Sequence, residues 1–65
     1  MEISYKKLWK VLIDKNMKKI DLKDLAGISS SSLAKLGKNE PVTLEVLMKI
    51  CEALDVNIGD IVEFI

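Results

Sequence analysis

The sequence contains no histidine and no arginine, and it has only one cysteine, Cys51, and one proline, Pro41. A single cysteine cannot form a disulfide within the chain, and without histidine there is no metal-ligand spacing. We therefore expect no disulfide framework, no metal and no cofactor. A chain of 65 residues buries only about 60% of its unfolded surface, so its stability must come from close helix packing or from a partner chain.

Long apolar runs are missing as well. No stretch approaches the roughly 20 apolar residues of a membrane span, and residues 1–4 lack the basic segment and apolar run of a signal peptide. A cytoplasmic protein without membrane contact is therefore expected. The chain also lacks a glycine-rich phosphate loop and a nucleophile–base pair, so we expect no enzymatic activity and no small-molecule ligand.

The charges are unevenly distributed, although the formal net charge is zero. Residues 1–40 hold nine lysines and five acidic residues, whereas residues 41–65 hold a single lysine, Lys49, and five acidic residues. This asymmetry predicts one surface for a polyanion and a second surface for something else. The alternative interpretation is a dipolar soluble protein without a polyanionic partner.

Apolar periodicity predicts five helices and no strand. The expected helices cover about residues 5–16, 19–26, 29–37, 44–54 and 58–65. Their predicted N-caps include Ser4, Ser29, Thr43 and Asn57. Such side chains can accept a hydrogen bond from the free amides of a first helical turn. Glycine favours the left-handed conformation at a helix end, so Gly27 and Gly37 are expected to end the second and third helices.

The predicted inward faces are apolar stripes at helical spacing. They comprise Tyr5, Leu8, Trp9, Leu12 and Ile13 in the first helix, Leu22, Leu25 and Ala26 in the second, Leu33 and Leu36 in the third, and Leu44, Leu47, Cys51 and Leu54 in the fourth, with Met48 and Ile50 beside them. We interpret Tyr5 and Trp9 as core residues rather than base-stacking platforms. Cys51 is interpreted as a core thiol, because no neighbouring group would activate it.

Residues 18–36 have the order expected of a helix-turn-helix. Two short helices meet at a tight turn in which Gly27 permits the sharp bend, Ile28 fills the angle between the helices and Ser29 caps the second one. The outer face of that second helix is small and polar, so it can approach base edges in the major groove of DNA. An ordinary helical hairpin would carry more apolar residues on this face.

Four sequence blocks occur in order along the chain. They are Ser-Tyr-Lys-Lys-Leu-Trp at 4–9, Ala-Gly-Ile-Ser at 26–29, Ile-Cys-Glu-Ala-Leu at 50–54 and Asp-Ile-Val-Glu at 60–63. The set resembles the very short members of the Cro/CI-type (XRE-family) helix-turn-helix repressors of phages and bacteria. The resemblance implies an all-α, compact five-helix, lambda-repressor-like domain over residues 1–65. It also implies a bacterial transcriptional regulator, a repressor, whose partner is double-stranded DNA.

The resemblance also implies which residues would meet DNA. Base contacts would come from Ser30, Ser31 and Lys35. Contacts to the DNA backbone would come from Lys18, Lys19, Ser29, Ser32, Lys38, Asn39 and Thr43, several of which lie at helix N-termini, where amides and the helix dipole favour an anion. The alternatives are that Ser30 and Ser31 only cap the helix, and that Lys35 and Lys38 belong to a solvated face.

Three departures from the family pattern are visible. Lys18 stands where a serine or threonine often caps the second helix, and Lys23 stands where a small residue is usual. Many members pair an arginine of the first helix with a glutamate at the position of Gly37, and this chain has neither. Lysine cannot form the two-pronged contact with guanine that arginine makes, so modest base readout is expected.

The final eight residues contain five apolar ones, namely Ile58, Ile61, Val62, Phe64 and Ile65. On a helix they would span about 160° of the surface, which is more than one face packed on a small domain needs. They predict a homodimer through the fifth helix, bound to a palindromic operator. Two alternatives stay open. Phe64 could fold back beside Trp9 or Tyr5 in a monomer, or the chain could be an antitoxin-like or regulatory protein-interaction module that docks through its acidic C-terminal half.

Overall fold

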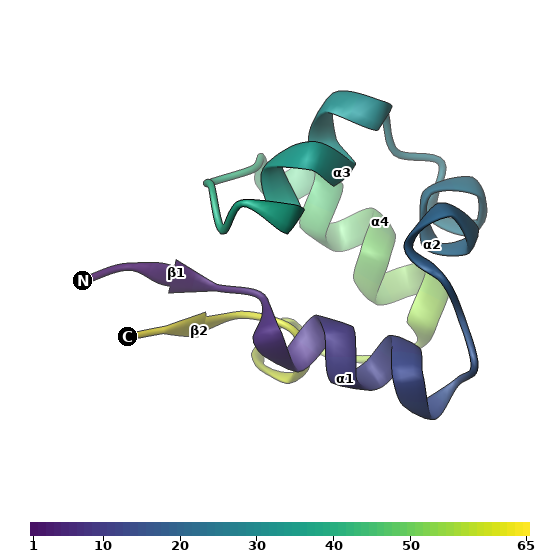
Figure 1. Ribbon diagram of the computed structural model, residues 1–65, viewed down its shortest axis with the longest axis horizontal. Helices are drawn as coiled ribbons and strands as arrows, with labels where there is room; N and C mark the ends of the chain where they lie inside the picture. Colours follow the sequence, from purple (N-terminus) through teal and green to yellow (C-terminus); the bar gives the residue numbers. More distant parts are fainter.

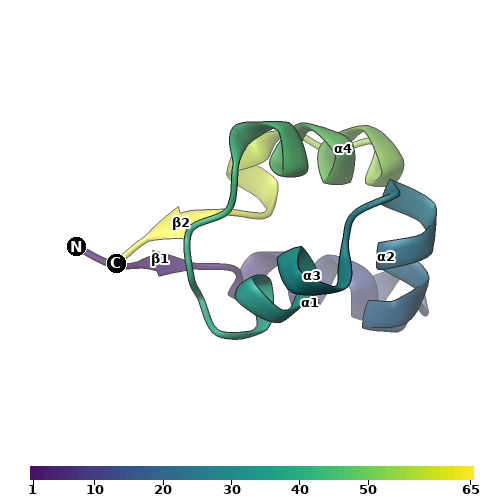
Figure 2. The same cartoon turned by 90° about the horizontal axis from the view of Figure 1, so that it is seen from above.

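The computed structural model describes residues 1–65 as four α-helices, one 3-10 helix and two short strands. In chain order these are β1 (Ile3–Ser4), α1 (Lys6–Asp14), α2 (Lys19–Ala26), α3 (Ser30–Gly37), α4 (Leu44–Leu54), the 3-10 helix η1 (Ile58–Asp60) and β2 (Glu63–Phe64). Figure 1 shows α1 along one edge, α2 and α3 away from it, and the two strands beside each other where both termini lie. Viewed from above, α3 and α4 lie on opposite sides and α2 closes one end (Figure 2). No helix is long and apolar enough to cross a bilayer.

Each α-helix is followed, within two residues of its end, by a residue with a left-handed backbone. These residues are Asn16, Gly27, Asn39 and Asp55, with φ of 69° at the glycine and 55° at the other three. After α3, the N–H of Asn39 donates to the Leu36 carbonyl at 3.2 Å and that of Glu40 donates to the Lys35 carbonyl at 2.9 Å, which is a Schellman motif. The expectation that Gly37 ends α3 is confirmed, because Gly37 is the last helical residue. The residue with the left-handed backbone is not this glycine but Asn39, and asparagine tolerates that conformation.

Two of the predicted N-caps are confirmed. The Ser29 hydroxyl accepts a hydrogen bond from the Ser32 N–H at 3.1 Å, and the Thr43 hydroxyl accepts one from the Val46 N–H at 3.2 Å. Each cap satisfies one of the first-turn amides that have no partner within the helix. The starts of α3 and α4 are therefore fixed by residues next to them in the sequence.

The other two α-helices begin differently. Ser4 is not the N-cap of α1, because it lies in β1 and the N-cap position is Tyr5. The buried Ser4 hydroxyl still accepts a hydrogen bond from the Lys6 N–H at 3.3 Å. At α2 the Lys18 side chain offers no acceptor, but the Asp21 carboxylate accepts a hydrogen bond from the Lys18 N–H at 2.8 Å. This bond is one half of a capping box.

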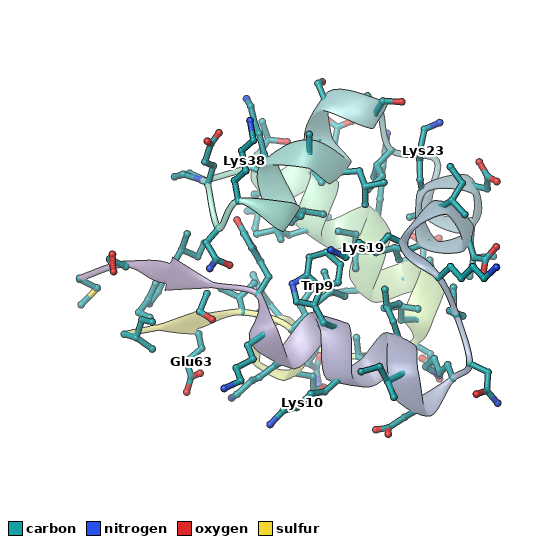
Figure 3. The ribbon with its side chains drawn as sticks, viewed as in Figure 1. Trp9, Lys10, Lys19, Lys23, Lys38 and Glu63 are labelled. Atoms are coloured by element: carbon teal, nitrogen blue, oxygen red, sulfur yellow. The ribbon has the colours of Figure 1, made fainter.

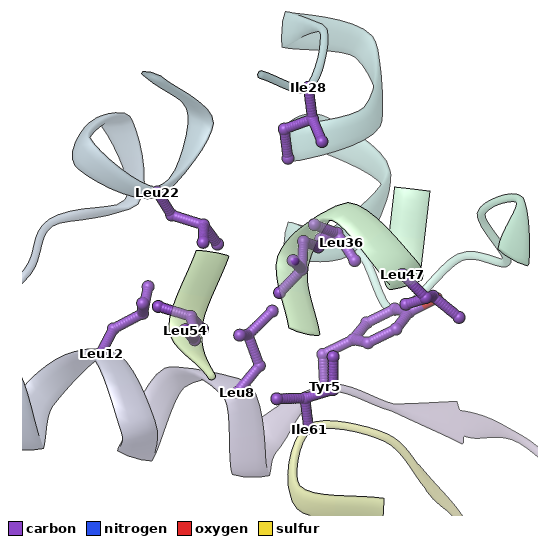
Figure 4. Packing of buried hydrophobic residues seen from close by; sticks show 10 residues of the cluster. Tyr5, Leu8, Leu12, Leu22, Ile28, Leu36, Leu47, Leu54 and Ile61 are labelled. Atoms are coloured by element: carbon purple, nitrogen blue, oxygen red, sulfur yellow. The ribbon is translucent and has the colours of Figure 1, made fainter. Parts of the chain in front are cut away.

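The core is one cluster of ten buried side chains (Figure 4). They come from all four α-helices, from the turn between α2 and α3, and from the residues just before α1 and just after η1. Its members are Tyr5, Leu8, Leu12, Leu22, Ile28, Leu36, Leu47, Ile50, Leu54 and Ile61. Helix α2 packs against both α3 and α4. Ile28 is buried in the turn between α2 and α3, which confirms that it fills the angle between these helices.

The predicted inward stripe of α4 is rotated in the structure. Helix α4 buries Leu47, Ile50 and Leu54, while Cys51 is only half-buried. The large apolar residues that the helices leave exposed are Ile13, Ile20, Leu25, Leu44 and Met48. Helix α4 is apolar around most of its surface, so several stripes fit its sequence, and the partner helices decide which one is buried.

The predicted fifth helix is wrong. Only η1, a single turn, forms there, and the next residues are extended so that β2 pairs antiparallel with β1, with Ile3 opposite Phe64. Two backbone hydrogen bonds between Glu2 and Ile65, at 2.7 Å and 2.9 Å, continue the ladder. The expectation of no strand is therefore also wrong, although the mostly helical fold is confirmed.

The composition of this segment explains the error. The apolar spacing of residues 58–65 fits a helix, but the run Ile-Val-Glu-Phe-Ile at 61–65 is β-branched and aromatic, which equally suits a strand. The predicted capping arrangement does form, since the Asn57 N–H donates to the Asp60 carboxylate at 2.9 Å. This capping arrangement starts only the single turn η1, because the residues after Ile61 become extended and pair with β1.

We expect Gly27→Ala to destabilise the fold by about 1–2 kcal/mol, because an L-residue with a left-handed backbone incurs this cost. The space around Gly27 is open, so the effect should come from its φ of 69° and not from a clash. Gly37→Ala is the matched control. It is helical and equally open, and it should stabilise by about 0.5–1 kcal/mol. Urea unfolding measures the free energy of unfolding of both variants. Changes of the same sign in the two variants would contradict this explanation.

Candidate nucleic-acid interface

Helices α2 and α3 form the predicted helix-turn-helix. Helix α2 ends at Gly27, the buried Ile28 follows, and Ser29 caps α3. On the inner side of α3, Leu36 is fully buried and Leu33 is half-buried. Helix α3 is therefore anchored through one face only, and its opposite face is open to solvent.

The open face of α3 carries small hydroxyl side chains. Ser30, Ser31 and Lys35 are exposed. The Ser29 hydroxyl lies 3.0 Å from the hydroxyls of both Ser31 and Ser32, which forms a hydroxyl cluster at the start of the helix. The capping interpretation thus accounts for Ser29 and for part of the role of Ser31 and Ser32. The hydrogen bonds of this cluster do not involve Ser30, whose hydroxyl is available to an outside partner.

The lysines around this helix-turn-helix have no acidic partner. The ion pair in the structure joins Lys49 and Glu45 of α4, at 3.6 Å. The exposed lysines of the helix-turn-helix and of the loop after it are Lys18, Lys19, Lys35 and Lys38, and Lys23 is half-buried. No carboxylate lies within ion-pair distance of these lysines, and Figure 3 shows Lys23 and Lys38 on either side of α3. Lysines without carboxylate partners suit a polyanion.

The loop after α3 is held by a buried tyrosine. The Tyr5 N–H donates to the Asn39 side-chain oxygen at 3.1 Å, and the Tyr5 hydroxyl donates to the Glu40 carbonyl at 2.7 Å. Tyr5 is fully buried, and burial raises the pKa of its hydroxyl. The hydroxyl therefore stays a neutral hydrogen-bond donor at physiological pH. Asn39, predicted to meet the DNA backbone, uses its carbonyl oxygen inside the protein.

An aromatic ring lies beneath one of the predicted contact lysines. The ammonium group of Lys19, the first residue of α2, is 4.5 Å from the centre of the Trp9 ring. Trp9 is half-buried and packs against the core from α1. The prediction of Trp9 as a packing residue therefore describes only part of its surroundings. Neither periodicity nor local spacing indicates this pair, because the two residues belong to different helices.

The remaining polar and acidic groups form neither a reactive thiol nor a metal site. Burial raises the pKa of the half-buried Cys51 thiol, and the negative charge of Asp60 adds to that shift, so the thiol is protonated at neutral pH. No group of three or more histidine, cysteine or acidic residues is close enough to hold a metal ion. The ammonium group of Lys7 on α1 donates to the Gly59 carbonyl at 3.3 Å and links α1 to η1.

The five residues predicted to form the dimer interface are not on one surface. Ile61 is fully buried in the core and Val62 is half-buried, whereas Ile58, Phe64 and Ile65 are exposed. The side chain of Phe64 is 66% exposed, so it does not fold back into a buried position beside Trp9 or Tyr5. The end of the chain therefore presents a smaller apolar surface than a fifth helix would have done.

Comparisons with known proteins agree with this geometry. The family profile of the Cro/C1-type HTH DNA-binding domain matches residues 7–65. The crystal structure of the transcriptional regulator VanUg, Form II, is 56% identical in sequence, with a TM-score of 0.92, over 95% of this chain and 83% of that chain. No curated protein sequence matches the chain. The chain belongs to the Cro/C1-type helix-turn-helix DNA-binding family.

Proposed function

We propose that this chain binds double-stranded DNA sequence-specifically and acts as a bacterial, cytoplasmic transcriptional repressor. The observation that carries the proposal is the open face of α3, where Ser30, Ser31 and Lys35 are exposed among lysines without acidic partners. A helix with small side chains fits into the major groove, and unpaired lysines around it attract phosphates. The similarity to a transcriptional regulator over nearly the whole chain supports the same role.

The proposed contacts fall into two classes. Ser30, Ser31 and Lys35 would meet base edges, because they are exposed on the first two turns of α3. The DNA backbone would be held by Lys18, Lys19, Ser29, Ser32, Lys38, Asn39 and Thr43. Ser29 and Thr43 cap α3 and α4, and helix N-termini attract phosphate groups. Helix α4, which carries Glu45 and Glu52, lies across the molecule from α3 (Figure 2).

A homodimer on a palindromic operator is part of the proposal. Ile58, Phe64 and Ile65 remain exposed, together with the half-buried Val62, and a small domain gains stability by covering such residues against its own copy. Ile61 would contribute only by supporting this surface from the core. A two-fold dimer would set its two α3 helices about 34 Å apart, which is one turn of DNA.

A second candidate function rests on a different surface. A shallow hollow of about 350 Å³ lies between α4 and η1, lined mainly by apolar residues that include Leu44, Met48 and Ile58. A protein-interaction module, antitoxin-like or regulatory, could dock a partner there without binding DNA specifically. The absence of duplex binding at low salt would favour this candidate.

The salt dependence of DNA binding tests the electrostatic part of the proposal. If four to six phosphates are neutralised, log K should fall with log salt at a slope of roughly −4 to −5, because bound counterions are released. Fluorescence anisotropy with a labelled duplex between low and physiological salt measures this slope. A flat dependence would contradict binding through the lysines around α3.

Substitutions should separate base contacts from backbone contacts. Lys35→Ala and Ser31→Ala should reduce the preference for specific over non-specific duplex by about 1–3 kcal/mol wherever the contact is a good one. Lys19→Ala should weaken binding to all sequences nearly equally. Affinities are measured for operator and scrambled duplexes, with thermal melting as the folding control. If all three variants shift both affinities together, α3 is not the recognition helix.

Sedimentation at micromolar concentration tests the dimer. The wild type should sediment as a dimer, and Phe64→Asp should dissociate it without unfolding, because the side chain is 66% exposed in the single chain. Ile13→Asp is the matched control, since this residue is exposed on α1, away from the proposed interface. A monomeric wild type, or equal dissociation by both variants, would refute the proposed interface.

A further inference from the structure

Trp9 and Lys19 form the one pairing of a cation with an aromatic ring in the structure. Trp9 lies on α1 and Lys19 opens α2, and the intervening turn brings the ammonium group to 4.5 Å from the ring centre. Figure 3 shows the pair on the same side of the molecule as Lys38 and Lys23. The ring is anchored because Trp9 packs against the core, so the ammonium group rests on a fixed support.

This support differs physically from an ion pair. A carboxylate that held Lys19 in place would also neutralise its charge, and it would compete with a phosphate group for the ammonium. An aromatic face attracts the cation through its quadrupole and leaves the full positive charge in place. Lys19 has no carboxylate within ion-pair distance. The ring occupies one side of the ammonium group, and N–H donors on the other side remain free.

We infer that Trp9 is a positioning residue for DNA binding, whose ring holds the Lys19 ammonium ready for a phosphate of the DNA backbone. The inference rests on the proposed DNA-binding function. A free lysine side chain loses much rotational freedom when it contacts a phosphate. A lysine that already lies on a ring loses less, so the same contact gives tighter binding. Trp9 thereby contributes to affinity without touching DNA.

A double-mutant cycle tests whether Trp9 acts through Lys19. We expect Trp9→Leu to weaken duplex binding about two- to fivefold, the range expected for a pair of this kind at an exposed site. In the Lys19→Met background, which keeps the apolar stem but removes the charge, Trp9→Leu should change affinity by much less. Trp9→Phe, which retains an aromatic face, should fall between the wild type and Trp9→Leu.

The salt slope gives a readout that lost packing does not move. Lys19→Met should reduce the slope by about 0.9, because one phosphate contact is lost, whereas Trp9→Leu should leave it unchanged, since the lysine charge remains. If Trp9→Leu lowers duplex affinity equally in the wild-type and Lys19→Met backgrounds, Trp9 only packs against the core, and the inference is overturned. Tighter binding by Trp9→Leu would show that the ring competes with phosphate, which overturns it as well.

A measurement on the free protein separates this inference from the proposed function. Ring currents from Trp9 should shift the Hε proton resonances of Lys19 upfield in the wild type. The shift should be smaller in Trp9→Phe and in Trp9→Leu. The exposed Lys10 of α1 is the control whose resonances should not shift. Unshifted Lys19 resonances with intact duplex binding would overturn the inference alone. Shifted resonances in a wild type that does not bind duplex DNA would overturn the proposed function, and the inference with it.

Discussion

The two hydrogen bonds of the buried Tyr5 fix the segment on which the proposed DNA-binding face of α3 depends. Its N–H binds the Asn39 side chain and its hydroxyl binds the Glu40 carbonyl. The N–H groups of the same two residues close the end of α3. One residue just before α1, through its backbone N–H and its side chain, therefore holds the segment that closes the end of α3. This matters because α3 has few other anchors, since its outer face is polar and only Leu36 is fully buried.

Local signals predicted the helix-turn-helix well. A cap acts on amides within three or four residues of itself, so Ser29 and Thr43 could be identified from their neighbours alone. Gly27 with the following Ile28 likewise specified the turn, because a left-handed backbone and an apolar plug are both local needs. The surface that would meet DNA was visible in the sequence for the same reason, as small hydroxyl residues on the side of α3 opposite to its apolar positions.

Features that depend on distant residues could not be predicted. The pairing of β1 with β2 joins the two ends of the chain, and it decides that residues 63–64 form a strand although their spacing suits a helix. The rotation of α4 toward Ile50 depends on the helices packed around it. The Trp9–Lys19 and Tyr5–Asn39 contacts each join different elements. Periodicity shows that a residue is apolar or charged, but not which partner it meets.

The exposed face of α3 is proposed to read DNA sequence. Selection of bound duplexes from a random pool tests it most directly, because no operator need be known beforehand. Wild-type protein should enrich an inverted repeat, and Lys35→Ala should enrich a more degenerate version of that repeat. A pool that stays random after repeated rounds at low salt, or an identical motif with both proteins, would contradict the claim.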